Sequence, residues 1–147
     1  MARIGQLADY YCQALPNSPR EAVALAEAEL EHRRPESVTL VGSSLGGFYA
    51  TYLAEKHGWK AVLVNPAVHA HKLLRAALGP QTNWHTGESW VLTEAHLNEL
   101  AALDVEAITR RASRKREYRR PDRGRGIDGV GVWLVAVHRS GPWVFRT

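Results

Sequence analysis

The spacing of apolar residues predicts a helix near the start of the chain. Apolar side chains recur every three or four positions from Val23 to Leu30, the spacing of one helix face. Ser18 suits an N-cap and Pro19 suits the first helical position. We therefore predict a helix over residues 19–33, preceded by a short strand in the stretch DYYC.

Short apolar runs predict the strands of a sheet. The runs SVTLVG and KAVLVNP are rich in β-branched residues, which is typical of strands buried on both faces. Between and after them, helical patterns cover residues 45–57, 67–79 and 93–103, and a polar loop covers residues 80–90. Because helices alternate with buried strands, the pattern predicts an α/β fold with a parallel sheet flanked by helices.

The junction between the first buried strand and its helix carries the candidate chemistry. The residues Gly42-Ser43-Ser44-Leu45-Gly46 have the G-x-S-x-G pattern of a nucleophile elbow, in which a strained turn holds a serine hydroxyl clear of the sheet. The helix that follows presents free backbone N–H groups and the positive end of its dipole. We predict Ser44 as a nucleophile and the N–H of Leu45 as an oxyanion donor, with the elbow glycines Gly42, Gly46 and Gly47.

Two other interpretations of this junction are a glycine-rich phosphate-binding turn and a plain tight connection between strand and helix. A Walker loop is excluded because no Gly-Lys-Ser/Thr follows the glycines. A dinucleotide-binding turn would need the spacing G-x-G-x-x-G, which is absent at this junction.

Four stretches resemble the YqiA-like esterases, a small family of bacterial α/β-hydrolases. They are LPNSPREA, VGSSLGGFYATYLAE, AVLVNPAV and TGESWVLTEAHLNELAALDVEAITR, in order over residues 10–110. The resemblance implies a truncated α/β-hydrolase-like parallel sheet, a serine nucleophile, and a small acyl ester or thioester as the substrate. It therefore implies a serine esterase that acts by acyl transfer.

Two parts of the family pattern are not readable in the sequence. Family members open with a strand carrying a YLHGF-type motif, whose loop supplies the second oxyanion N–H. They carry the acid in a TGDEVLD-type motif and the base in a GGDHGF-type motif, both near the C-terminus. This chain begins after the first motif, and neither of the others is readable after Arg110. We expect a partial hydrolase domain over residues 1–109 that is catalytically weak or inactive.

The charge changes sharply near residue 110. Residues 1–109 have 8 basic and 12 acidic side chains, a net charge of −4, whereas residues 110–147 have 11 basic and 3 acidic, a net charge of +8. Like charges dominate the start of this tail, although the later run VGVWLVAV is apolar and strand-like. We expect residues 110–147 to form a basic, irregular tail that is non-native or poorly ordered.

A shifted reading frame is one hypothesis for this tail. Permitted codons for residues 122–128, moved one base forward, encode Thr-Gly-Asp-Glu-Val-Leu, and the same move over residues 141–145 gives Asp-His-Gly-Phe. The alternatives are a tail of other purpose and a genuine basic arm of a non-catalytic protein that contacts RNA or DNA. Salt-dependent nucleic-acid retention, abolished by truncation at Arg110, would favour that arm.

The histidines and the single cysteine bear on cofactors and compartment. His69, His71 and His85 follow the strand after the elbow and could lie at the catalytic edge of the sheet. No histidine or cysteine cluster has metal-ligand spacing, so we expect no metal and no cofactor. With one cysteine, Cys12, and no long apolar run, we expect a cytoplasmic protein that does not enter a membrane.

Overall fold

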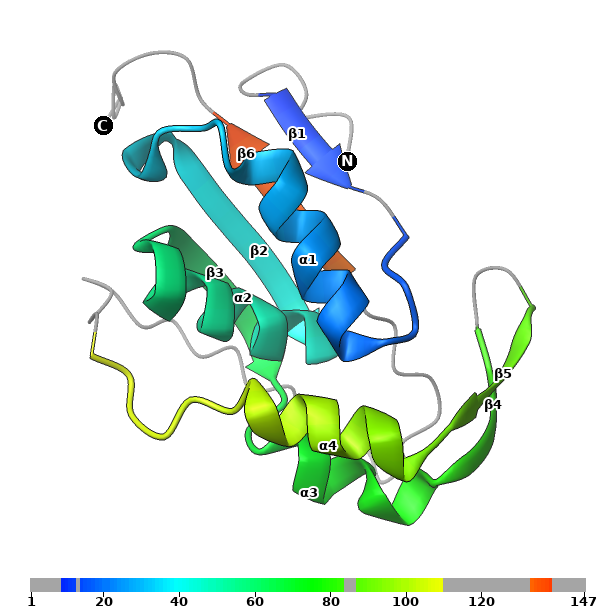
Figure 1. Cartoon of the computed structure of the whole chain (residues 1–147). Helices are drawn as coiled ribbons and strands as arrows, with labels where there is room; N and C mark the ends of the chain where they lie inside the picture. The colour runs from blue at the N-terminus through cyan, green and yellow to red at the C-terminus, as the bar shows by residue number, and fades with distance from the viewer. Residues whose placement is uncertain (1–8, 13, 84–86, 110–132, 139–147) are drawn as a thin grey trace.

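The computed structural model describes residues 9–12, 14–83, 87–109 and 133–138 (Figure 1). The strands are β1 (Asp9–Cys12), β2 (Val38–Ser44), β3 (Lys60–Pro66), β4 (Gly79–Thr82), β5 (Ser89–Leu92) and β6 (Trp133–His138). The α-helices are α1 (Pro19–Leu30), α2 (Leu45–His57), α3 (Ala70–Leu73) and α4 (Glu94–Ala102), and short 3₁₀ helices cover Pro35–Ser37 and Leu74–Ala77. None of the helices in these ranges is long and apolar enough to cross a bilayer.

The main sheet confirms the predicted α/β architecture of a small parallel sheet flanked by helices. Its strand order is β1-β6-β2-β3, and β2 and β3 pair in parallel, with Leu40 opposite Ala61. Strand β6 lies between β1 and β2 and is antiparallel to both, so residues 133–138 form a strand where we expected an irregular tail, and only the β2–β3 pair of this sheet is parallel. The apolar pattern of VGVWLVAV is consistent with a strand, but its place depends on pairing over about 90 residues of sequence, which no local pattern encodes. Residues 110–132 and 139–147 lie outside the described ranges, so what we expect of them stays a prediction.

One face of the sheet forms the core with α1 and α2 (Figure 1). Strand β2 contributes Leu40, which is fully buried, and α2 contributes Leu53, also fully buried. Successive strand residues point to opposite faces. Val62 and Val64 alternate with the partly buried Ala61 and Leu63 that pack on this core, and they are exposed.

The predicted cap at Ser18 is present, while one loop prediction is wrong. The hydroxyl of Ser18 accepts a hydrogen bond from the backbone N–H of Glu21, and Thr93 forms a capping box with His96. Residues 80–90, predicted as a polar loop, include parts of an antiparallel ribbon in which β4 pairs with β5. The segment Gly-Pro-Gln-Thr of β4 shows no alternation of apolar and polar residues, so its sequence does not predict a strand, although exposed and partly buried positions alternate along it.

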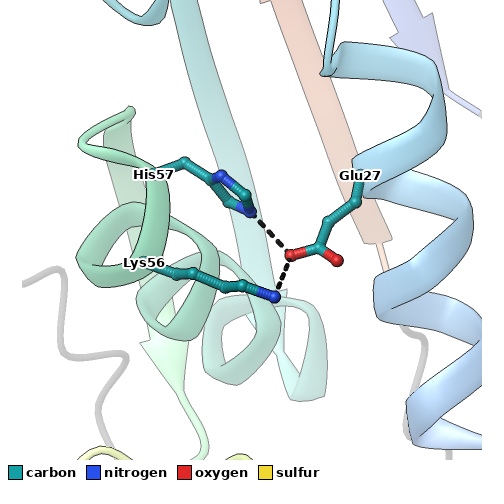
Figure 2. Close-up of polar contacts among 3 residues, drawn as sticks. All are labelled: Glu27, Lys56 and His57. Atoms are coloured by element: carbon teal, nitrogen blue, oxygen red, sulfur yellow. Dashed lines mark hydrogen bonds and ion pairs between the residues drawn. The ribbon is translucent and has the colours of Figure 1, made fainter.

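A charged cluster joins α1 to the C-terminal end of α2 (Figure 2). Oε1 of Glu27 lies 2.6 Å from Nε2 of His57 and 2.8 Å from Nζ of Lys56. The ring of His57 also stacks on Trp59, with 4.4 Å between the ring centroids. Gly58, with a φ of 75°, ends the helix in the left-handed conformation that glycine favours. This end of α2 is therefore held by packing, pairing and a regular cap.

Candidate active site

Ser44 lies in a strained turn at the junction of β2 and α2. It is the last residue of β2 and the N-cap of α2, which begins at Leu45. Its φ of 52° and ψ of −120° lie in a region that residues with a side chain rarely adopt. The geometry predicted from the glycine spacing is therefore the geometry found, whereas the role of Ser44 as a nucleophile stays a prediction.

Close contact between the strand end and the first turn of α2 explains the glycines. A Cβ on Gly42 would lie 2.2 Å from the carbonyl oxygen of Gly46 and 2.7 Å from the backbone nitrogen of Gly47. A Cβ on Gly47 would lie 2.8 Å from Cβ of Pro66, at the end of β3. Both approaches are too short for real side chains, so the turn requires glycine at positions 42 and 47. Gly46 takes part in this contact through its carbonyl oxygen, which a side chain at position 42 would strike.

The first turn of α2 begins immediately after the candidate nucleophile. The side chain of Ser44 does not cap this helix, and the first turn contains no acidic residue. The N–H groups at a helix start have no partner within the helix and carry the positive end of its dipole. An anion that forms on a substrate bound at Ser44 would thus meet backbone donors, and the N–H of Leu45 is the candidate among them.

Three strained residues gather at the carboxyl end of β2 and β3. Ser44, Asn65 and His69 are the non-glycine residues with positive φ among those described, with φ values of 52°, 44° and 51°. The backbone N–H of Ala67 donates a hydrogen bond to the carbonyl oxygen of Ser44 at 2.9 Å, which ties the segment after β3 to the elbow. Residues in such conformations cluster at functional sites, because the surrounding fold has to stabilise them.

An acid–base pair stands in the segment that follows. Nδ1 of His69 lies 2.7 Å from Oδ2 of Asp104, which follows the C-terminal end of α4. The Asp104 side chain is 18% exposed and that of His69 is 49% exposed. Nδ1 of His71 lies 3.5 Å from the same carboxylate oxygen, but its geometry is not that of a hydrogen bond, and this buried nitrogen has no hydrogen-bond partner among the described residues.

The sequence indicated only one member of the pair His69–Asp104 as a candidate. His69 and His71 were candidates because they follow the strand beside the elbow, and His85 lies outside the described residues. Asp104 was not a candidate, because it is separated from His69 by 35 positions, and the family-like stretch that contains it assigns it no role. Its one available signal was a carboxylate directly after a predicted helix of the α/β unit.

Tyr49 is not suited to act as a base at this site. It lies in α2 one turn after Leu45, and its side chain is buried at 2% exposure. Burial, followed by the nearby carboxylate of Glu99, raises the pKa of the Tyr49 hydroxyl far above its ordinary value. The phenol therefore stays protonated and contributes packing. Within the described ranges, no group of three or more His, Cys, Asp or Glu side chains is arranged to hold a metal ion.

The fold and the turn together define an α/β protein with a strained serine between a parallel strand and a helix start. A family comparison places the chain more narrowly. It belongs to the uncharacterised protein family UPF0227, the YqiA-like family, whose model matches residues 1–118. The matched region includes the elbow, both parallel strands, α4 and the first nine residues of the basic tail.

Proposed function

We propose that this protein is a serine esterase with Ser44 as its nucleophile and a small acyl ester or thioester as its substrate. The observation that carries the proposal is the conformation of Ser44, with a φ of 52° directly before the first residue of α2. A plain connection between strand and helix would have no need of a strained serine there. Strain of this kind costs on the order of 1–3 kcal/mol and is found where it serves a function.

The proposed reaction is acyl transfer through a covalent intermediate. Oγ of Ser44 attacks the carbonyl carbon of the substrate, its proton passes to a base, and the carbonyl electron pair moves to the oxygen. The N–H of Leu45 stabilises that oxyanion, the alcohol or thiol leaves with a proton, and an acylated Ser44 remains. Water then attacks the acyl group and releases the acid, which regenerates the serine.

We expect turnover of this chain to be slow. The family motifs for the acid and the base are not readable in the sequence. Members of a triad act as a unit, so a serine without the family's acid and base motifs retains only part of the rate enhancement. The proposal therefore concerns the identity of the nucleophile and the reaction class rather than a high rate.

Hydrolysis of p-nitrophenyl butyrate tests this proposal. We expect slow release of p-nitrophenol by the full chain, with a pre-steady-state burst if the acyl-enzyme accumulates. Ser44→Ala should lower the release to the rate in buffer, whereas the neighbouring control Ser43→Ala should keep most of it. Equal loss in both variants, or full activity in Ser44→Ala, would contradict the assignment. Far-ultraviolet circular dichroism of each variant would establish that it is folded.

A further inference from the structure

We propose that His69, held by Asp104, is the base that accepts the proton of Ser44. This inference rests on the proposed function and assigns the partner that its first step needs. His69 would be catalytic, since it exchanges a proton with the reacting serine. Asp104 would be a positioning residue that acts through the histidine.

The backbone brings His69 to the edge where Ser44 stands. The N–H of Ala67 donates to the carbonyl oxygen of Ser44, and His69 follows Ala67 by two residues. Two residues of extended chain span about 7 Å at most, so the imidazole starts from a backbone close to the elbow. Ser44 and His69 both have a positive φ without being glycine, and such a conformation persists only where the surrounding structure holds it.

The hydrogen bond to Asp104 selects the nitrogen that remains for chemistry. Nδ1 of His69 faces Oδ2 of Asp104 at 2.7 Å, so in the neutral ring this nitrogen carries the proton and donates it. Nε2 then holds the lone pair that can accept a proton. With Asp104 as orienter and His69 as base, the chemical roles are those of a serine triad, although the chain order Ser-His-Asp differs from the Ser-Asp-His order of α/β-hydrolases.

The other groups packed around His69 do not offer a better base. Its ring meets that of His71 edge-on, with 6.2 Å between centroids, and Asp104 faces both rings. His71 is more buried than His69, with side chains 21% and 49% exposed respectively. His69 therefore combines an orienting carboxylate with access to a substrate.

Ser44, His69 and Asp104 suffice for the proton transfers of the first step. The proton of the Ser44 hydroxyl moves to Nε2 of His69 as the new bond from Oγ to the substrate carbonyl carbon forms. The imidazolium that results is stabilised by the Asp104 carboxylate, and it returns the proton to the leaving alcohol or thiol. Ser44 and His69 share no hydrogen bond among those of the described residues, so the side chains must draw together when substrate binds, as catalytic pairs often do.

Covalent labelling of Ser44 by a fluorophosphonate tests the base without requiring turnover. His69→Gly suits the test because glycine tolerates the positive φ and leaves room for free imidazole. We expect labelling to fall at least tenfold in His69→Gly and to recover several-fold when imidazole is added. His69→Asn, which also tolerates this φ, should show the same fall, and the control His71→Asn should label at close to the wild-type rate.

Nuclear magnetic resonance of the ¹⁵N-labelled chain supplies a readout that is independent of reactivity. The proposal requires His69 to carry its neutral-state proton on Nδ1, and Asp104→Asn should reduce that preference and slow labelling several-fold. A proton on Nε2, or unchanged labelling in His69→Gly, would overturn the role of His69 while leaving Ser44 as the nucleophile. Absence of wild-type labelling at Ser44 would overturn the proposed function and the base assignment together.

Discussion

Helix α2 begins and ends in two very different environments. At its start, Ser44 has a positive φ, no side-chain cap closes the helix, and a Cβ at Gly42 would clash with the backbone of the first turn. At its end, Gly58 provides a regular left-handed cap, while His57 pairs with Glu27 and stacks on Trp59. One end of the helix is strained and has backbone donors free of side-chain caps, whereas the other end is paired and packed.

This difference indicates how the fold divides stability from function. The paired end joins α1 to α2 over the covered face of the sheet, so it stabilises the scaffold (Figure 2). The strained end lies at the carboxyl edge of parallel strands, where α/β proteins place their ligands. A strained turn persists only when the surrounding structure holds it, and the paired end of the same helix belongs to that structure.

The largest effect is expected from adding a methyl group at the strained end. In Gly42→Ala the new Cβ would lie 2.2 Å from the carbonyl oxygen of Gly46, so the elbow must shift. We expect the free energy of unfolding to fall by about 3 kcal/mol, as in severe overpacking, and labelling of Ser44 to be lost. Urea unfolding measures the first effect and mass spectrometry the second.

Gly79→Ala is the matched control for that substitution. Gly79 has a φ of 117°, but a Cβ there would have no neighbour within 4 Å. It should therefore cost about 1 kcal/mol, from backbone strain alone, and leave the labelling of Ser44 unchanged. Equal losses of stability in Gly42→Ala and Gly79→Ala would contradict the claim that a Cβ at position 42 crowds the elbow.

The paired end predicts a smaller effect that depends on pH. Burial alone would raise the pKa of Glu27, but hydrogen bonds from Lys56 and His57 outweigh it and hold this pKa below its ordinary value. A carboxyl whose pKa is lowered by folding stabilises the fold above its unfolded pKa, and this contribution is lost as the pH falls through the folded value. The contribution is thus present above about pH 5 and declines below about pH 4.

Glu27→Gln should therefore lower the free energy of unfolding by about 1.5 kcal/mol at pH 7, an amount already reduced for partial exposure of the pair. The difference from wild type should shrink as the pH falls through the lowered pKa of Glu27, because the protonated glutamic acid is then as neutral as glutamine. Glu31→Gln is the control, because Glu31 pairs with His32 on the exposed surface, where side chains are 60% and 88% exposed. A difference that is constant with pH would contradict the ionic account.

The smallest effect has the opposite sign. Ser44→Gly should relieve the strain of the positive φ and raise the free energy of unfolding by about 1 kcal/mol, net of the entropy that glycine adds to the unfolded chain. The same substitution removes the nucleophile, so stability should rise while labelling disappears. Ser44→Ala, which loses the hydroxyl but keeps a Cβ, should show no such gain in urea unfolding. A destabilised Ser44→Gly would contradict strain at this position.

The elbow was predictable because its requirement is local. Gly42 and Gly47 are needed for contacts within a few residues or with the end of the next strand, and Ser18 caps a helix that starts beside it. Such steric and hydrogen-bond rules leave a direct trace in the sequence. The parallel pair β2 and β3 was predictable for a related reason, since both are short apolar runs that flank a helix.

The parts that escaped prediction depend on contacts between distant residues. Strand β6 pairs with β1 and β2 across most of the chain, and nothing in its own apolar pattern selects that position. The contact of Asp104 with His69 depends on the packing of α4 against α3 and α1. In such cases the sequence pattern predicts that a helix or strand forms, but it does not predict which distant segment that element will contact.

The most direct test of the central claim is peptide mapping after reaction of the native chain with a fluorophosphonate. The chain has seven serines, including the adjacent Ser43, so selectivity is informative. Our account predicts one adduct, on Ser44, which forms in the native protein and not in urea, where the strained turn is absent. An adduct on Ser43, adducts spread over several serines, or equal reaction in urea would contradict it.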